Sequence, residues 1–156
     1  MTKNRRKEFR PESGEKRVSH SRDRFITVNN LVLHYLEWDG KEEPQMLLLH
    51  GATGHAHLWD AFAPAFTDSY RVIALDQRGH GESGWASPPS YRAEDYVADL
   101  AEFIDSLGLG EVTLIGHSMG ALHATIYAAT YPDRVRRLVF IDIEACPQLK
   151  WREYLR

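Results

Sequence analysis

Short apolar runs alternate with longer amphipathic stretches along the chain, and this alternation predicts strands that alternate with helices. The run at 46–49 is continuously apolar, as expected for a strand with both faces buried. The pattern predicts an α/β fold with a mainly parallel sheet and helices on both faces. The predicted strands are residues 25–28, 31–38, 46–49, 70–75, 111–115 and 137–143; the predicted helices are 58–66, 90–107 and one that ends at Tyr131-Pro132.

Turn and cap signals mark the ends of several elements. Asn29-Asn30 joins the first two strands, because asparagine tolerates the positive φ of a tight hairpin turn. Ser90 is a candidate N-cap for the second helix, and Gly108 is a candidate stop just past its end. The length and this continuous order predict a single ordered domain.

The segment Gly116-His117-Ser118-Met119-Gly120 follows an apolar strand and precedes a helix rich in small residues. A serine at such a strand–turn–helix junction has a strained backbone, and its hydroxyl is exposed over the end of the sheet. The flanking glycines remove side chains that would collide at this bend. The pattern predicts that Ser118 is a nucleophile. The alternative is a serine that caps the helix N-terminus.

Acyl transfer through a serine also needs N–H donors for the oxyanion that develops on the substrate. The backbone N–H of Met119, the residue after the nucleophile, is the first candidate donor. The loop 50–54 contains glycines that let the main chain approach a substrate carbonyl, and Ala52 is its candidate donor. The alternative for this loop is an ordinary turn between a strand and a helix.

Another glycine-rich segment, residues 76–84, contains the spacing G-x-G-x-x-G after a strand. A dinucleotide site requires a helix to open directly at these glycines, but Trp85 and the Ser-Pro-Pro run that follows cannot begin one. We therefore expect no nucleotide cofactor. Asp76 and Arg78 are expected to brace the loop beneath the site through charge-assisted hydrogen bonds.

Charge is distributed unevenly along the chain. The net charge is only -3, which favours no class of partner, but residues 1–22 hold eight Lys or Arg against three acids. This segment has few apolar side chains, so we expect 1–22 to be a disordered basic tail. A role in binding nucleic acid or anionic membranes is the less favoured alternative.

Several other classes of site are not expected. Cys146 is the single cysteine, which excludes an intrachain disulfide and a cysteine-cluster zinc site. A zinc site formed by His50, His55 and His57 lacks a carboxylate ligand at suitable spacing, so no metal is expected. The chain has neither a signal-peptide core nor a run of transmembrane length, so we expect a cytoplasmic protein without membrane or nucleic-acid partners. The sequence carries no signal for a particular oligomeric state.

Three motifs together resemble the α/β-hydrolase superfamily, and the resemblance covers residues 24 to 147. In chain order they are His50-Gly51-Ala52, residues 76–83, and the segment from Gly116 to Gly120. The turn from Gly116 to Gly120 corresponds to the nucleophile elbow of this superfamily and is called the elbow below. Its serine differs from the haloalkane dehalogenase and epoxide hydrolase branches, which attack through a carboxylate.

The resemblance implies roles and boundaries. Ser118 is the implied nucleophile, Met119 and Ala52 form the implied oxyanion hole, and the second strand of the sheet is expected to run antiparallel. The α/β-hydrolase core is expected at 23–147, truncated after about the sixth strand, with the start of a lid at 148–156.

The catalytic acid and histidine are less well placed. The superfamily positions them after the nucleophile, whereas no histidine follows His123. Asp142 and Glu144 lie at the end of the sixth strand, where a few relatives take their acid, so Asp142 is a candidate; the alternative is a loop cap or lid anchor. The upstream histidines are expected to be structural, namely His50, His55, His57, His117 and His123.

These features predict a serine hydrolase that acts without a cofactor on an ester or related small-molecule acyl compound. Because the catalytic histidine is missing, we expect an N-terminal fragment with feeble or no turnover. Acyl transfer or perhydrolysis would use the same nucleophile. The alternative from another class is a catalytically silent α/β-hydrolase-like protein that binds a ligand or a partner subunit.

Overall fold

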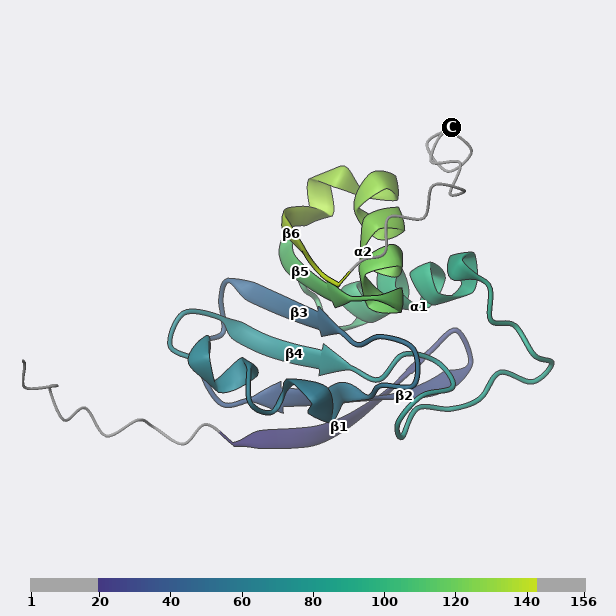
Figure 1. Ribbon diagram of the computed structural model, residues 1–156, viewed down its shortest axis with the longest axis horizontal. Coiled ribbons are helices and arrows are strands. Elements are labelled where there is room, and N and C mark those ends of the chain that lie inside the picture. The colour runs from purple at the N-terminus through teal and green to yellow at the C-terminus, as the bar shows by residue number, and fades with distance from the viewer. Residues whose placement is uncertain (1–19, 143–156) are drawn as a thin grey trace, which may run out of the picture.

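The computed structural model describes residues 20–142, which form one six-stranded sheet with helices and short turns on its faces (Figure 1). The basic tail up to residue 19, Glu144, Cys146 and the expected lid at 148–156 lie outside the described residues. The strands are β1 (Ser21–Val28), β2 (Leu31–Trp38), β3 (Gln45–Leu49), β4 (Arg71–Leu75), β5 (Val112–His117) and β6 (Val135–Ile141); the helices are α1 (Ala93–Ser106) and α2 (Met119–Thr130), with 3₁₀ turns η1 (Ala56–Trp59), η2 (Ala63–Ala65) and η3 (Pro132–Arg134).

The sheet has the order β1-β2-β4-β3-β5-β6. Strand β2 pairs antiparallel with both β1 and β4, whereas the β3–β4, β3–β5 and β5–β6 pairs are parallel. This topology confirms the mainly parallel α/β sheet and the antiparallel second strand. The carboxyl ends of β3, β4 and β5 consequently meet at one edge, where the three motif-bearing loops begin.

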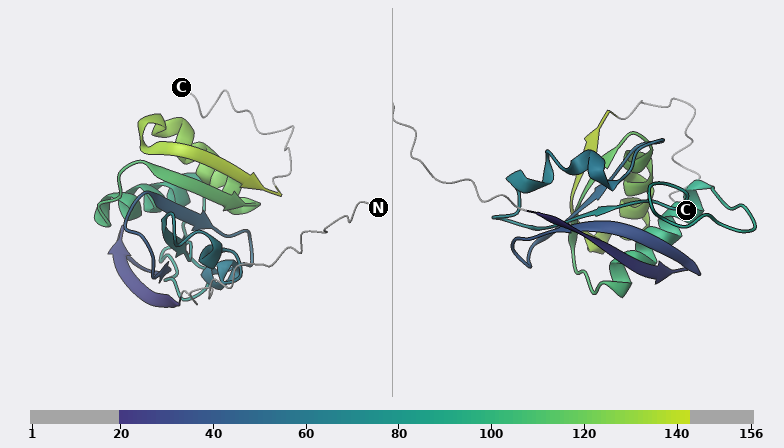
Figure 2. Two further views of the ribbon diagram at one scale, coloured as in Figure 1. Left: turned by 90° about the vertical axis from the view of Figure 1, so that its left-hand side faces the viewer. Right: turned by 90° about the horizontal axis from the view of Figure 1, so that it is seen from below.

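Alternate residues of the central strands pack into two separate cores. Leu47 of β3 packs with Phe103 of α1 and Tyr127 of α2, while its neighbour Leu48 packs with Trp59 of η1 on the other face. The two α-helices thus lie on one side of the sheet, and the 3₁₀ turns η1 and η2 lie on the other (Figure 2). Both faces are covered, which explains why β3 is apolar from Met46 to Leu49.

The predicted helix at 58–66 is wrong. The structure has two short 3₁₀ turns instead, η1 and η2. Pro64 has no N–H to donate to the preceding turn, so a continuous α-helix would lose a hydrogen bond there.

The first strand begins earlier than predicted, at Ser21, and takes in Ser21 and Arg22, which the sequence pattern assigned to the tail. Its pairing with β2 extends from Val28 to Ser21, which lies opposite Trp38. Both residues are polar, Ser21 is partly exposed, and the exposed Arg22 pairs with Asp39 at 2.6 Å. Apolar patterning missed them because backbone pairing at a sheet edge does not require buried side chains. The Asn29-Asn30 turn is confirmed, with positive φ at both residues.

Helix α1 begins at Ala93, with Arg92 rather than Ser90 at the N-cap position. The Arg92 N–H donates to the Asp95 carboxylate at 2.8 Å, so the acid in the first turn supplies the cap. Gly108 ends the helix as predicted, with a positive φ of 62°.

Candidate active site

Ser118 lies between the end of β5 and the start of α2, in the predicted strand–turn–helix context. Its φ of 49° and ψ of -113° lie in a region that residues with a side chain rarely adopt. Ser118 holds the N-cap position, but its hydroxyl makes no capping hydrogen bond. Its backbone N–H donates to the Ile141 carbonyl at the end of β6, at 3.0 Å. Capping therefore does not account for the serine at this strained position.

The glycines beside Ser118 are required by close approach. A Cβ added at Gly116 would lie 2.5 Å from the Gly120 carbonyl oxygen. A Cβ added at Gly120 would collide with the carbonyl oxygens of Leu49 and His50. The turn is therefore pressed against the end of β3, as the spacing of the motif predicted.

The loop after β3 lies directly against this turn. A Cβ at Gly51 would lie 2.7 Å from His117 Nδ1 and 3.2 Å from the Ser118 Cβ, so glycine permits the close approach. Ala52, the next residue, is exposed, and Met119 is half-buried. Met119 is the first residue of α2, where the N–H has no intrahelical acceptor. The structure thus brings together the segments that contain Ser118, Met119 and Ala52.

Asp76 anchors the loop that follows β4. Its carboxylate accepts hydrogen bonds from the Ala56 N–H, from the Glu82 N–H at 2.9 Å and from His34 Nδ1 at 2.7 Å. The side chain is buried, and a Cβ at Gly81 would collide with it. Since Ala56 begins η1, Asp76 connects its own loop to the segment that follows the oxyanion-loop candidate at 50–54.

Arg78 forms the second brace. Its guanidinium donates to both oxygens of the Asp99 carboxylate, at 2.6 and 2.7 Å, and to the Ser90 carbonyl at 2.7 Å. The hydrogen bond to Asp99 raises the pKa of Arg78. The predicted charge-assisted bracing is confirmed. No helix opens at the glycines of this loop, because α1 begins only at Ala93, so the geometry of a dinucleotide site is not present there.

Gln77, between the two braces, joins the oxyanion-loop candidate to α2. Its N–H donates to His50 Nε2 at 3.0 Å, and its side-chain NH₂ donates to the His50 carbonyl at 2.9 Å. His123 of α2 donates through Nδ1 to the Gln77 side-chain oxygen at 2.6 Å and stacks on Tyr96. The sequence motifs did not reveal this network. Its one local signal was the polar residue His50, which directly follows the buried strand β3.

The two histidines of this network are neutral at pH 7. Burial lowers the pKa of His50 to about 4, and burial together with the nearby His50 lowers the pKa of His123 to about 4. His50 accepts at Nε2 and donates through Nδ1 to the Gly51 carbonyl at 2.8 Å, so both of its ring nitrogens are engaged. The structural role expected for both residues is confirmed.

The remaining histidine candidates and the candidate acid are not part of the Gln77 network. His57 contacts Asp60 at 3.0 Å, and His55 packs edge-on against His57. His117 Nε2 is 3.9 Å from an oxygen of Asp142, whose side chain is 88% exposed at the end of β6. His117 Nδ1 is buried without a hydrogen-bond partner among residues 20–142. Asp142 thus sits at the edge of the sheet that carries Ser118.

None of the helices within residues 20–142 is long and apolar enough to cross a membrane.

Comparison with known proteins identifies relatives that are longer than this chain. The 2-(acetamidomethylene)succinate hydrolase of Mesorhizobium japonicum is 41% identical over 123 residues, which are 79% of this chain and 43% of that protein. Epoxide hydrolase 4 of Mus musculus is 37% identical over 118 residues, which are 75% of this chain and 33% of that protein. The chain therefore spans less than half the length of these curated relatives.

Solved structures agree with this placement. A bacterial membrane phospholipase A is 35% identical, with a TM-score of 0.76 over 80% of this chain and 40% of that chain. In sequence, residues 44–154 match the family model described as the alpha/beta hydrolase fold. With the sheet order, the elbow and this match in agreement, the chain belongs to the α/β hydrolase family.

Proposed function

We propose that the protein is a serine hydrolase in which Ser118 attacks the carbonyl carbon of an ester or a related small-molecule acyl compound. The backbone of Ser118 is the observation that carries the proposal, because a φ of 49° without a capping bond is a cost that packing alone does not require. The Ser118 oxygen bonds to the carbonyl carbon as its proton passes to a base. The bond to the leaving group then breaks, the base gives that proton to the departing alcohol, and an acyl-enzyme remains. Water then releases the acid and restores the hydroxyl.

The N–H groups of Met119 and Ala52 are the proposed oxyanion donors. The close approach of Gly51 to Ser118 supports this assignment, since it sets the two segments side by side. Met119 also opens α2, whose N-terminal end carries partial positive charge. Both donors are backbone groups on braced loops, so little reorganisation is needed when charge develops.

The proposed base comes from outside this chain. All eight histidines of the sequence lie within residues 20–142. Two that lie beside the motif loops, His50 and His123, are already engaged through Gln77. In the full-length protein we assign the base to a histidine beyond this sequence, and Asp142 is a candidate acid to orient it.

Serine at position 118 favours acyl substrates over epoxides. The relatives include an epoxide hydrolase from Mus musculus and a lipase from Mycobacterium tuberculosis, so their names leave both chemistries open. Within the superfamily that the motifs resemble, the epoxide hydrolase branch attacks through a carboxylate, whereas this chain has a hydroxyl at that position.

A fluorophosphonate probe tests the proposal on the chain as it is. We expect slow covalent labelling of the wild type, because the elbow and oxyanion donors act without the base. Ser118→Ala should abolish the labelling, and the exposed control Ser106→Ala should retain it. Absence of labelling at Ser118 would contradict the proposal and favour a silent binding protein, for which the engaged histidines are the supporting observation.

A further inference from the structure

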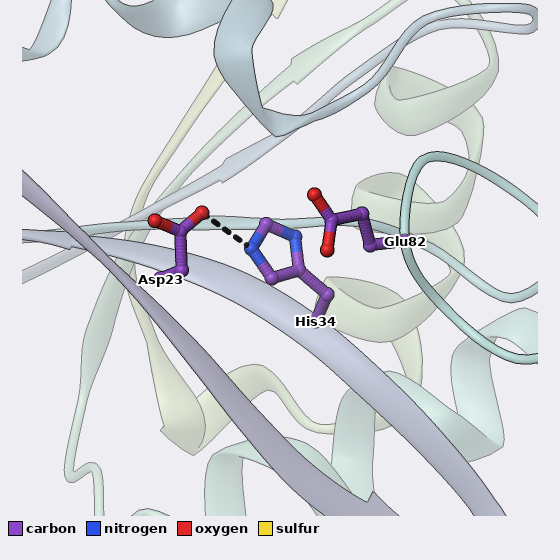
Figure 3. Close-up of side chains that lie close together, drawn as sticks. All are labelled: Asp23, His34 and Glu82. Atoms are coloured by element: carbon purple, nitrogen blue, oxygen red, sulfur yellow. Dashed lines mark hydrogen bonds and ion pairs between the residues drawn. The ribbon is translucent and has the colours of Figure 1, made fainter.

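A second cluster of ionisable side chains lies outside the elbow. Asp23 of β1, His34 of β2 and Glu82 of the loop after β4 converge, and one candidate ligand atom from each lies within 4.8 Å of the others (Figure 3). His34 is buried and fixed, whereas both carboxylates are exposed. The proposed acyl chemistry uses none of these three residues.

The hydrogen bonding of His34 leaves one ring nitrogen to be explained. Nδ1 lies 2.7 Å from an oxygen of Asp76, and a carboxylate can only accept, so Nδ1 carries the ring hydrogen. In a neutral ring Nε2 then has a lone pair. Nε2 nevertheless lies 3.1 Å from an oxygen of Asp23, which is also an acceptor. Two acceptors at this separation repel unless a proton or a metal ion lies between them.

His57 repeats the arrangement from a different element. Its Nδ1 is 3.0 Å from an oxygen of Asp60, and its Nε2 is 4.0 Å from the same Asp23 oxygen that faces His34. Two histidines, each held at Nδ1 by a carboxylate, therefore direct Nε2 towards one acid. This is the pattern in which carboxylates orient histidines that bind zinc.

We propose that Asp23, His34, His57 and Glu82 form a zinc site. Two imidazole nitrogens and two carboxylate oxygens suit Zn²⁺ in a tetrahedral arrangement. Metal–ligand distances of about 2.0–2.2 Å place neighbouring ligand atoms about 3.4 Å apart. The His34 Nε2 and Asp23 oxygen atoms are already near that separation. Only the side chains of Glu82 and His57 have to move closer to the ion, and both are exposed.

The site joins four parts of the fold. Its ligands come from β1, β2, η1 and the loop after β4. Asp76, which orients His34, also holds the Ala56 N–H at the start of η1. Bound zinc would therefore fasten the hairpin to the two loops that border the elbow.

Titration of the chelator-treated full chain with Zn²⁺ by calorimetry tests the site. We expect one ion per chain at micromolar affinity, and a rise in the thermal midpoint on zinc addition. Asp23→Asn and Glu82→Gln should each weaken binding by about 10-fold or more, and His57→Gln by a smaller factor. These side chains are exposed, so the variants should fold without zinc.

Glu94→Gln is the matched control, because Glu94 is an exposed acid of α1 that pairs with Arg92. It should bind zinc as the wild type does. The proposal is overturned if the wild type shows no saturable binding below roughly 1 mM zinc. It is equally overturned if Asp23→Asn and Glu82→Gln bind as tightly as Glu94→Gln, since the ion then lies elsewhere.

Discussion

Two loops at the same end of the sheet differ in how far their polar side chains are hydrogen-bonded. In the loop after β4, Asp76 accepts three hydrogen bonds and Arg78 donates three. In the turn after β5, the Ser118 hydroxyl makes no capping bond and the backbone has a positive φ. The first loop stabilises the fold, whereas the second keeps a side chain available at an energetic cost.

This contrast predicts opposite effects of substitution on stability in the two loops. Substitutions in the first loop should lower the free energy of unfolding, because they leave buried partners unpaired. Substitutions of Ser118 itself by glycine or alanine should leave that free energy nearly unchanged or raise it, as is common at strained sites.

Acidification gives the largest expected effect. The folded protein holds His50 and His123 at a pKa of about 4, below the ordinary value of 6.5. The unfolded chain therefore takes up more protons between these values. The stabilisation is fully present above pH 6.5 and is lost as the pH falls towards 4. We expect a loss of up to about 3 kcal/mol for each histidine, measured by urea unfolding across this range with chelator present.

His123→Gln tests the assignment of this pH dependence. The glutamine NH₂ can still donate to Gln77, but it does not titrate. The slope of unfolding free energy against pH should fall to about half, since one of two groups is removed. Equal slopes in variant and wild type would show that other groups cause the acid sensitivity.

Asp76→Ala is expected to cost about 4 kcal/mol of unfolding free energy. The substitution removes the acceptor from two backbone N–H groups, those of Ala56 and Glu82, and from the buried His34 Nδ1 at once. Chemical denaturation gives the measurement. Asp68→Ala, at an exposed acid, should change stability by no more than about 0.5 kcal/mol. Similar losses in both variants would remove the distinction between the two loops.

The smallest effect is expected at the elbow itself. Ser118→Gly should raise the unfolding free energy by about 1 kcal/mol, because glycine adopts this backbone conformation with little strain. Ser118→Ala keeps the Cβ and loses no capping bond, so it should remain within about 0.5 kcal/mol of the wild type. A clear destabilisation in Ser118→Ala would mean that the hydroxyl has a structural role.

Local motifs predicted the elbow well because its geometry depends on neighbours in the sequence. The positive φ at Ser118 and the close approach at Gly116 both follow from five consecutive residues. The pairing of β1 and the division of residues 56–65 were harder to predict. The former depends on backbone hydrogen bonds, and the latter on the missing N–H of Pro64.

The supporting network could not be predicted in the same way. Asp99 is the partner of Arg78 and His123 is the partner of Gln77, and both come from helices well separated in sequence from the loop. Sequence patterning identified Asp76 and Arg78 as residues that brace the loop, but it did not identify their hydrogen-bond partners. Such pairs are set by how the helices pack on the sheet, which a single sequence does not encode locally.

The border strand β6 is joined to the turn that holds Ser118 by a backbone hydrogen bond. Its last carbonyl, that of Ile141, receives the backbone N–H of Ser118, while Val139 and Phe140 remain 41% and 46% exposed. Any polypeptide that extends the sheet by pairing along β6 would consequently restrain the serine through a single shared bond. Strand pairing along β6 and the position of the Ser118 hydroxyl are therefore linked through this hydrogen bond.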